Sequence, residues 1–422
     1  MPMKTTSKLL WTMFFVAATI GFTSCSNNDE PAIPKEKNPD NTRKEIVLSR
    51  AEQELAAQCN DFAFRLLQTA DESMGKEQIV LSPLSASFAL SMAANGADGT
   101  TQQEILNTLG FSGFTVEEMN SYNQKLITEL NGLDNTSTIS IANSMWMAEN
   151  FSPLSSYKKA MDEYYDADVK AVDFSAPKTL SQINQWCSDK TDGLITDFFK
   201  SIDSDSRLIL LNALSFKGEW SQPFDDEGTH WGDFATSTGN QSVELMKKMD
   251  LVPYMTYDKF SIAKFLYGNG AFRLSVILPN EGVEASECLA DLNAEKWNTI
   301  QNEMQQTRLN VIFPKLKIEY REDLASLLEK LGMKEAFSLK ANFSNLSDES
   351  LFITKVEQAN YWNVTEEGTE AATITDVILG ATDPGPGNVI ESSDFHVTRP
   401  FLFILTEEST GSILYIGKIE RV

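Results

Sequence analysis

Apolar residues recur at intervals of three and four through much of the first half of the chain, and this spacing predicts helices. One helix is expected over Cys59 to Leu67. A second is expected over Ala86 to Ala94, because Ser82 is a favourable N-cap residue and Pro83 suits the first helical turn. A later helix is expected over Arg321 to Leu331.

Runs rich in β-branched and aromatic residues predict strands, mostly toward the C-terminal end. Helices early and strands late favour an α+β fold over an alternating, parallel one. From about Glu45 onward the chain shows no internal repeat and no second linker, so residues 45–422 are expected to form one domain. The expected strands are Thr138 to Trp146, Leu208 to Phe216, Phe272 to Leu278, Arg308 to Phe313, Phe401 to Leu405 and Ser412 to Ile419.

Composition narrows the functions that the chain can have. Hydrophobic residues make up 42% of the 422 residues, enough for a sizeable core, and the formal net charge of −25 disfavours nucleic acid as a partner. The two histidines, His230 and His396, exclude a multi-histidine metal site. The four cysteines form no CxxC pair. We therefore expect no metal and no cofactor.

Residues 1–24 have the features of a signal peptide, with two lysines before an apolar run that is too short to span a membrane. The Phe-Thr-Ser-Cys ending resembles a bacterial lipobox, which implies a lipid on Cys25. The polar, proline-bearing residues 25–44 then predict a flexible tether. This would anchor the protein to the outer membrane of a bacterial cell envelope, on the periplasmic or the extracellular face. The alternative is a cleaved secretory signal with an incidental Cys25.

The segment from Glu366 to Phe395 combines two incompatible patterns. Thr369 to Asp383 alternates as a half-buried strand does, with one uncharged face of small and β-branched residues. Its flanks, two glutamates with a glycine before and Pro384 to Gly387 after, are typical of exposed loops. This conflict favours a segment that is a loop in one state and a strand in another. A plain surface loop or an ordinary strand remains the alternative.

The run from Glu366 to Ala372 resembles the reactive-loop hinge of the serpins, a family of serine protease inhibitors. Further blocks resemble the family in the same order, over about Glu45 to Val422. The resemblance implies an α+β serpin fold of three β-sheets and about nine helices, with an exposed reactive-centre loop over about residues 366–394. The blocks include Asn60 to Ala63, Ser82 to Ser85, Ala93 to Ala97, Ile141 to Trp146, Thr191 to Ile195, Leu211 to Trp220, Phe313 to Lys315, Leu331 to Met333 and Arg399 to Phe401.

The resemblance implies a suicide-substrate inhibitor, not an enzyme. A target endopeptidase would cut the loop, stay attached as an acyl-enzyme, and be carried along as the loop inserts into the main sheet. The native monomer would then be metastable, held kinetically above its most stable form. One alternative is a non-inhibitory serpin that acts as a binding or structural surface lipoprotein. Others are a glycosidase with a carboxylate pair such as Asp225 and Asp226, or a glycan-binding lipoprotein.

Two sets of site residues follow from the resemblance. Small hinge residues would enter a sheet without burying charge. A polar cluster would hold the sheet shut; Gln358 stands there in place of a histidine found in many members, and it cannot titrate. The hinge is Glu366, Glu367, Gly368, Thr369, Glu370, Ala371, Ala372 and Thr373, and the sheet-opening cluster is Ser82, Pro83, Ser85, Asn212, Trp220 and Gln358.

The family's usual spacing, counted from Glu366, places the scissile bond between Thr382 and Asp383, with Ala381 or Leu379 as alternatives. No lysine or arginine occurs between Lys355 and Arg399, so the loop offers no cation to the acidic pocket of a trypsin-like protease. Elastase-like or subtilisin-like serine proteases are the expected targets, with papain-like cysteine proteases as a further option.

Overall fold

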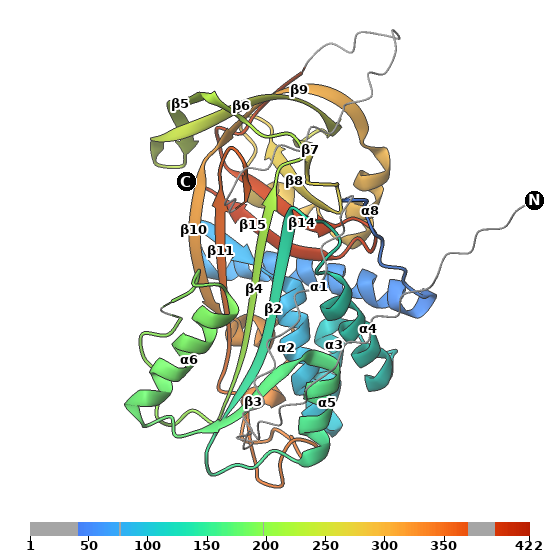
Figure 1. Cartoon of the computed structure of the whole chain (residues 1–422), viewed down its shortest axis with the longest axis vertical. Helices are drawn as coiled ribbons and strands as arrows, with labels where there is room; N and C mark the ends of the chain where they lie inside the picture. The colour runs from blue at the N-terminus through green and yellow to red at the C-terminus, as the bar shows by residue number, and fades with distance from the viewer. Residues whose placement is uncertain (1–40, 76, 197, 370–392) are drawn as a thin grey trace, which may run out of the picture. The chain divides into compact units, whose positions relative to one another are not determined.

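Two hydrogen-bonded β-sheets organise the part of the chain that the structure describes, residues 41–75, 77–196, 198–369 and 393–422. The structure is a computed structural model, and these residues all belong to one compact unit, Lys37–Val422. Figure 1 shows one sheet as long, nearly vertical strands and the other above and behind it.

The first sheet has six strands in the order β10-β11-β12-β4-β2-β3. Its centre is the antiparallel pair of β2 and β4, which runs from Ser137–Gly218 to Met147–Leu208. Strand β4 is buried over most of its length, because helices cover the sheet. The strands are β2 (Ser137–Ala148), β3 (Ala167–Val172), β4 (Leu208–Glu219), β10 (Leu316–Asp323), β11 (Lys355–Val364) and β12 (Gly368–Thr369).

The second sheet has nine strands, and its long strand β6 joins two blocks. Residues Leu245–Tyr254 of β6 pair with β9, whereas Tyr254–Thr256 pair with β7. The third sheet that the resemblance implied is therefore the block of β5, β6, β9 and β13, hydrogen-bonded through β6 to the rest. The strands are β1 (Gln78–Leu81), β5 (Asp225–Thr236), β6 (Gly239–Thr256), β7 (Phe260–Tyr267), β8 (Phe272–Pro279), β9 (Gln305–Pro314), β13 (Ser393–His396), β14 (Phe401–Glu407) and β15 (Ile413–Ile419).

Nine α-helices occur among the described residues, and together with the sheets they confirm the α+β class and the expected serpin-like architecture. A single 3₁₀ turn, η1 (Glu335–Phe337), follows the last of them. The helices are α1 (Arg50–Met74), α2 (Pro83–Gly96), α3 (Gly99–Leu109), α4 (Val116–Glu129), α5 (Ser155–Tyr165), α6 (Pro177–Lys190), α7 (Ala285–Ala290), α8 (Ala294–Glu303) and α9 (Ala325–Lys330).

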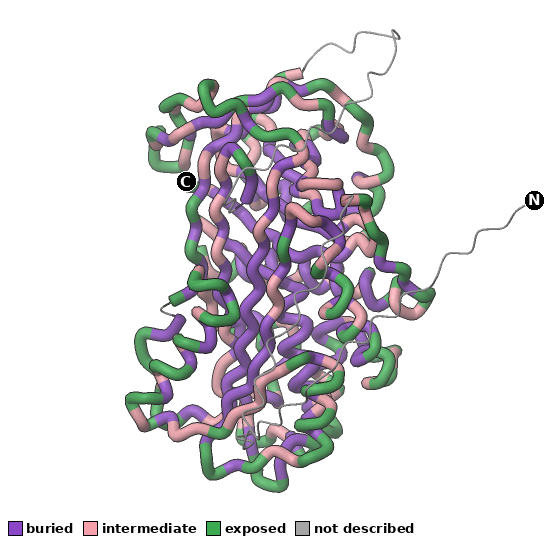
Figure 2. Tube along the Cα trace, in the orientation of Figure 1, coloured by how far each residue is buried: buried purple, intermediate pink, exposed green. Residues whose placement is uncertain are grey.

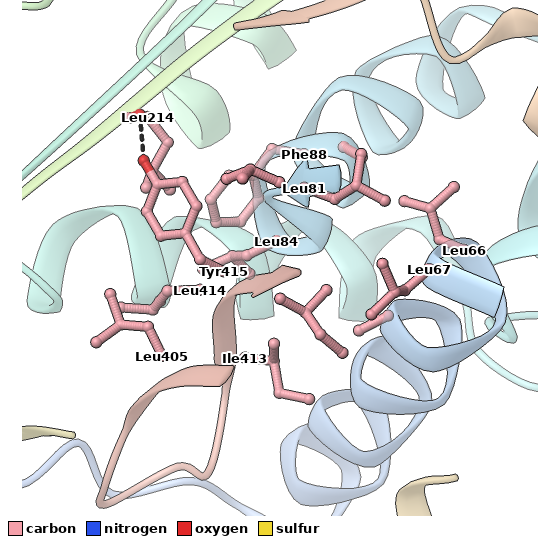
Figure 3. Close-up of a cluster of buried hydrophobic side chains, with 14 of the residues drawn as sticks. Leu66, Leu67, Leu81, Leu84, Phe88, Leu214, Leu405, Ile413, Leu414 and Tyr415 are labelled. Atoms are coloured by element: carbon pink, nitrogen blue, oxygen red, sulfur yellow. Dashed lines mark hydrogen bonds between the residues drawn. The ribbon is translucent and has the colours of Figure 1, made fainter. Parts of the chain in front are cut away.

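Helix α2 lies at the centre of the core, in contact with α1, β4 and β15. It is almost wholly buried, and apart from a few serines and one asparagine its residues are apolar or small, as expected for a helix surrounded by other elements. Figure 3 shows its Leu84 and Phe88 among leucines of α1 and residues of β15, where the Tyr415 hydroxyl donates a hydrogen bond to the Leu214 carbonyl. Figure 2 shows that buried residues run along the length of the central strands. Ser82, Ser85, Asn212 and Gln358, discussed below, are among the buried residues.

The helix predicted over Arg321 to Leu331 was wrong at its N-terminal end. Residues Leu316–Asp323 form strand β10, and α9 covers only Ala325–Lys330. The period-two signal was present, because Leu316, Ile318 and Tyr320 are buried and the lysine and glutamate between them are exposed. The helix predicted over Ala86 to Ala94 was right and continues to Gly96, with Ser82 as its N-cap.

Candidate functional site

The six-stranded sheet is parted at one end by the hinge strand β12. Gly368 and Thr369 pair antiparallel with Glu219 and Gly218 of β4, and Thr369 also pairs antiparallel with Val364 of β11. Farther along, β11 pairs directly with β4 in parallel, from Lys355–Ile209 to Ala359–Ala213. The same two strands are thus separated at one end and joined at the other.

Gly368 lies so close to β4 that no side chain fits there. A Cβ atom on this residue would lie 2.0 Å from the carbonyl oxygen of Gly218 and 2.8 Å from the Cα of Glu219. The next residue, Thr369, is 1% exposed, and its hydroxyl forms a 2.6 Å hydrogen bond with the hydroxyl of Tyr267. Gly368 and Thr369 are therefore packed into the sheet as a short strand, not laid over it.

Trp220, at the end of β4, holds the turn that precedes β12. Its backbone N–H donates to the carbonyl of Glu367 at 2.8 Å, and its indole N–H donates to the carbonyl of Thr365 at 3.1 Å. The indole ring stacks on Tyr267 with ring centroids 4.2 Å apart. One aromatic pair thus supports both the turn and the hinge strand.

Glu366 is held by two side chains, Thr229 of β5 and Lys315, which lies between β9 and β10. Its carboxylate lies 2.9 Å from the Lys315 ammonium and accepts a 2.6 Å hydrogen bond from the Thr229 hydroxyl. Burial acts to raise the pKa of Glu366, but these hydrogen bonds outweigh it, so the pKa lies below its ordinary value. The backbone N–H of Phe224 also donates to the Glu366 carbonyl at 2.9 Å. The first hinge residue is therefore anchored as a carboxylate.

Buried amides join the closed part of the sheet to α2. The side chain of Gln358 accepts a hydrogen bond from Ser82 N–H at 2.9 Å and donates one to the Ser82 carbonyl at 2.7 Å. Asn212 of β4 accepts a hydrogen bond from the Ser85 hydroxyl and donates to Asn143 of β2. Asn143, Asn212 and Gln358 stand in one row, because they are paired in register across β2, β4 and β11. We call Ser82, Ser85, Asn143, Asn212 and Gln358 the amide latch.

Comparison with known proteins decides the family. The family model described as Serpin (serine protease inhibitor) matches residues 57–422. This chain is a serpin. It is 32% identical to Iripin-1 of Ixodes ricinus over 86% of this chain and 93% of that protein. It is 30% identical to leukocyte elastase inhibitor A of Mus musculus, over 86% and 98%. The crystal structure of the thermophilic serpin tengpin in the native state superposes with a TM-score of 0.80 at 29% identity, covering 90% and 97%.

Several contact residues of the serpin's site had not been singled out from its sequence. Asn143 completes the amide latch, and Lys315, Thr229 and Tyr267 hold the hinge. Asn360 adds a 2.6 Å hydrogen bond from its amide to the Val80 carbonyl, beside Gln358. Register across the sheets brings these residues together. Asn143 and Lys315 lie in sequence blocks that resemble the family, but no local pattern predicts which residues they contact. Pro83, by contrast, starts α2 and makes no polar contact through its ring.

Other predicted site residues lie outside the described residues or away from the hinge. Residues 1–24, Cys25, Glu370, Ala371, Ala372, Thr373, Leu379, Ala381, Thr382 and Asp383 are among those not described. Ser393 and Asp394, placed at the end of the loop, lie in β13 and pair with β9.

The described end of the predicted tether contacts the body of the protein. The side-chain oxygen of Asn41 accepts a 2.8 Å hydrogen bond from Asn135 N–H. Its carbonyl accepts another, at 3.2 Å, from the side chain of Asn269. The flexible part of a tether would therefore end before Asn41, not at Lys44.

The described residues offer few other candidates for a catalytic or metal-binding site. Asp225 and Asp226 are exposed on β5. The three described cysteines, Cys59, Cys187 and Cys288, are buried free thiols. Among the described residues no cluster of His, Cys, Asp and Glu is suited to a metal, and no helix could span a bilayer.

Proposed function

We propose that this serpin inhibits an endopeptidase as a suicide substrate, by inserting its cleaved loop into the six-stranded sheet. The observation that carries the proposal is the position of β12 between β4 and β11. An inhibitor of this kind needs a hinge that can start a new strand, and here Gly368 and Thr369 already occupy the first two positions of one.

Extending β12 would improve the pairing in the sheet. Beyond it, β11 and β4 form a parallel ladder from Lys355 to Ala359. An inserted strand would run antiparallel to both neighbours and replace one parallel ladder by two antiparallel ones. Each new residue would satisfy backbone groups on both sides. This gain is the free energy that a metastable native state would release after cleavage.

The composition of the loop supports targets with small or apolar specificity pockets. Lys355 and Arg399 bracket a stretch without any cation, which disfavours trypsin-like proteases. The scissile bond is proposed at Thr382–Asp383, with Ala381 or Leu379 as the alternatives. One relative is named as an inhibitor of leukocyte elastase. Elastase-like and subtilisin-like serine proteases are therefore the proposed targets, and papain-like cysteine proteases the second class.

The function is tested by mixing the protein with pancreatic elastase, subtilisin, papain and trypsin. A denaturing gel should show a covalent complex with elastase or subtilisin, and mass spectrometry of the released C-terminal fragment locates the cut. Cleavage without a complex, and without a rise in the thermal midpoint of the cut protein, would overturn inhibition and favour a binding or structural serpin. A complex with trypsin alone would overturn the proposed target class.

A hinge variant separates cleavage from insertion. Thr369 is buried, and in a strand that continues from it Ala371 would share the same face, so Ala371→Arg would bury an unpaired charge, which is costly. The loop should still be cut, but the variant should turn over as a substrate and not retain the protease. Ser204→Arg, at an exposed position, adds the same charge and should inhibit like the wild type. Equal inhibition by Ala371→Arg would contradict strand insertion.

We further propose that the protein is a lipoprotein attached through Cys25 after removal of residues 1–24. The lipobox-like sequence before Cys25 supports this. Expression with a clickable fatty acid should label the wild type and leave Cys25→Ala unlabelled and released from the membrane fraction. Protease accessibility on whole cells then distinguishes the extracellular from the periplasmic face. A soluble, unlabelled wild-type protein would leave only the secretory alternative.

A further inference from the structure

Two of the five large hydrophobic side chains that are exposed among the described residues lie on one strand. Met249 is 50% exposed and Leu251 is 44% exposed, and both belong to β6. They lie two residues apart, so their side chains project from the same face of the sheet. A single exposed hydrophobic residue is ordinary, whereas neighbouring ones on a shared face can form part of a contact surface.

The opposite face of this part of β6 is the one that packs against the protein. Met246, Lys248 and Val252 alternate with the exposed residues, and none of the three is more than 5% exposed. An antiparallel sheet with one buried face normally carries polar residues on the other face. Met249 and Leu251 depart from this pattern, and packing inside the protein does not require them.

The register between β6 and β9 defines the exposed surface around the two residues. Met249 pairs with Asn310, and Leu251 pairs with Arg308. Figure 1 shows β5, β6 and β9 together at one end of the molecule. We call the surface formed by exposed Lys247, Met249, Leu251 and Arg308 and half-buried Ile312 the β6–β9 face.

The charges on and beside the β6–β9 face balance among the described residues. Lys247 and Arg308 lie on it, and Lys247 is paired in register with Asp225 of β5. Asp394 of β13 lies opposite Asn310, whose side chain donates a 2.8 Å hydrogen bond to the Asp394 carboxylate. Without an excess of one sign, the face suits apolar contact, as in the buried core of protein–protein interfaces, where methionine and arginine are enriched.

We propose that the β6–β9 face is a docking surface for the target endopeptidase, separate from the contacts that its active site makes with the loop. This rests on the proposed function. The loop leaves the described part of the protein at Thr369 in β12 and rejoins it at Ser393 in β13. Because β13 is next to β9, and β9 is next to β6, strand β6 lies only about 10 Å from β13.

A protease bound at the proposed scissile bond is confined to the neighbourhood of this face. Asp383 lies ten residues before Ser393, and a chain of that length spans at most about 35 Å. A protease of about 200 residues has a radius of gyration of about 16 Å, so its surface can reach β6 while its active site holds the loop. The contact with the face is then intramolecular, and it strengthens binding of the loop without changing the loop itself.

The test is the second-order rate constant for formation of the covalent complex with pancreatic elastase and with subtilisin. Replacing both hydrophobic residues, Met249→Ser together with Leu251→Ser, should lower it at least about fivefold with the protease that the wild type captures. Each single replacement should lower it less. The number of inhibitor molecules consumed per protease should not change, because insertion of the loop is unaffected. Leu339→Ser removes a leucine that is 89% exposed beyond η1 and should inhibit like the wild type.

Binding without cleavage gives a second readout. The same protease with its catalytic serine replaced by alanine cannot form an acyl-enzyme, so its dissociation constant reports docking alone. That constant should rise for the double variant by about the same factor as the rate constant falls. The thermal midpoint of the double variant should match that of the wild type, because both side chains are largely exposed, and this shows that the variant is folded.

The outcomes separate the docking surface from the proposed function. If the wild type and the double variant form the complex at equal rates, the docking surface is wrong and suicide inhibition stands. If the wild type forms no complex with any protease, the proposed function is wrong, and the docking surface with it. A wild type that sediments as a dimer, with a monomeric double variant that inhibits equally well, would assign the face to a second copy of this chain and overturn the proposal.

Discussion

The two ends of the β4–β11 pair show the same strands in two different arrangements. At one end, β12 separates them and is held by aromatic stacking and the Lys315–Glu366 ion pair. At the other end they pair directly in parallel, and the amide latch joins them to α2. At the separated end, the sheet holds two residues of an extra strand while β4 stays paired with β2 and β11 stays paired with β10. The two ends differ in the polar groups that stabilise them: the Lys315–Glu366 ion pair at the separated end and the amide latch at the end where β4 and β11 pair directly.

The largest loss of stability is expected from Gln358→Ala, at the closed end of the sheet where β4 and β11 pair directly. It leaves the buried N–H of Ser82 and one N–H of the Asn360 amide without their partner, at a cost of about 1–3 kcal/mol for each group, whereas the Ser82 carbonyl keeps the hydrogen bond from Ala86 N–H. Urea denaturation should show this loss in the free energy of unfolding. The native state should also convert faster to an inhibition-incompetent form on mild heating. An unchanged denaturation midpoint would mean that water replaces the hydrogen bonds of Gln358 and that these bonds do not stabilise the native state.

A slightly smaller loss of stability is expected from Gly368→Val, at the parted end of the sheet where β12 lies between β4 and β11. Its side chain would collide with the backbone of β4, and overpacking typically costs about 1–3 kcal/mol. The hinge can relieve the clash by leaving the sheet, so less of the loss should appear in stability and more in the yield of protease complex. Gly113→Val is the matched control, because a Cβ there meets nothing within 4 Å. Full complex formation by Gly368→Val would show that β12 is not the starting point of insertion.

These contacts also mark the limit of what could be predicted from sequence. The hinge composition predicted that Gly368 and Thr369 can enter a sheet, but not that they already lie in one. That depends on strands β4 and β11, which are far apart along the chain. Lys315 and Glu366 are likewise distant in sequence and meet only because two sheets adjoin. Blocks of matching residues predict a family fold well, whereas long-range side-chain pairs need the register between strands.

Acid should loosen the parted end before the closed end. The pKa of Glu366 is lowered in the folded protein, so its stabilising contribution is complete above its ordinary pKa and is lost as the pH falls below it. Glu366→Gln can still accept hydrogen bonds from Thr229 and Lys315 but carries no charge. Thermal midpoints measured from pH 6 down to pH 3 should fall more steeply in the wild type than in this variant. Parallel curves would show that the Glu366 charge contributes nothing.

The closed end, by contrast, should not respond to pH near neutrality, because glutamine has no titratable group. Gln358→His introduces one into the same buried position between Ser82 and Asn360. Burial disfavours the charged imidazole, so protonation at low pH should weaken the latch only in this variant. Inhibition rates measured from pH 5 to 8, with a protease of constant activity over that range, should stay level for the wild type and change for Gln358→His. A wild-type inhibition rate that varies strongly between pH 5 and 8 would mean that a titratable group outside the amide latch controls opening of the sheet. The different pH responses of the two ends would then not be explained by Gln358.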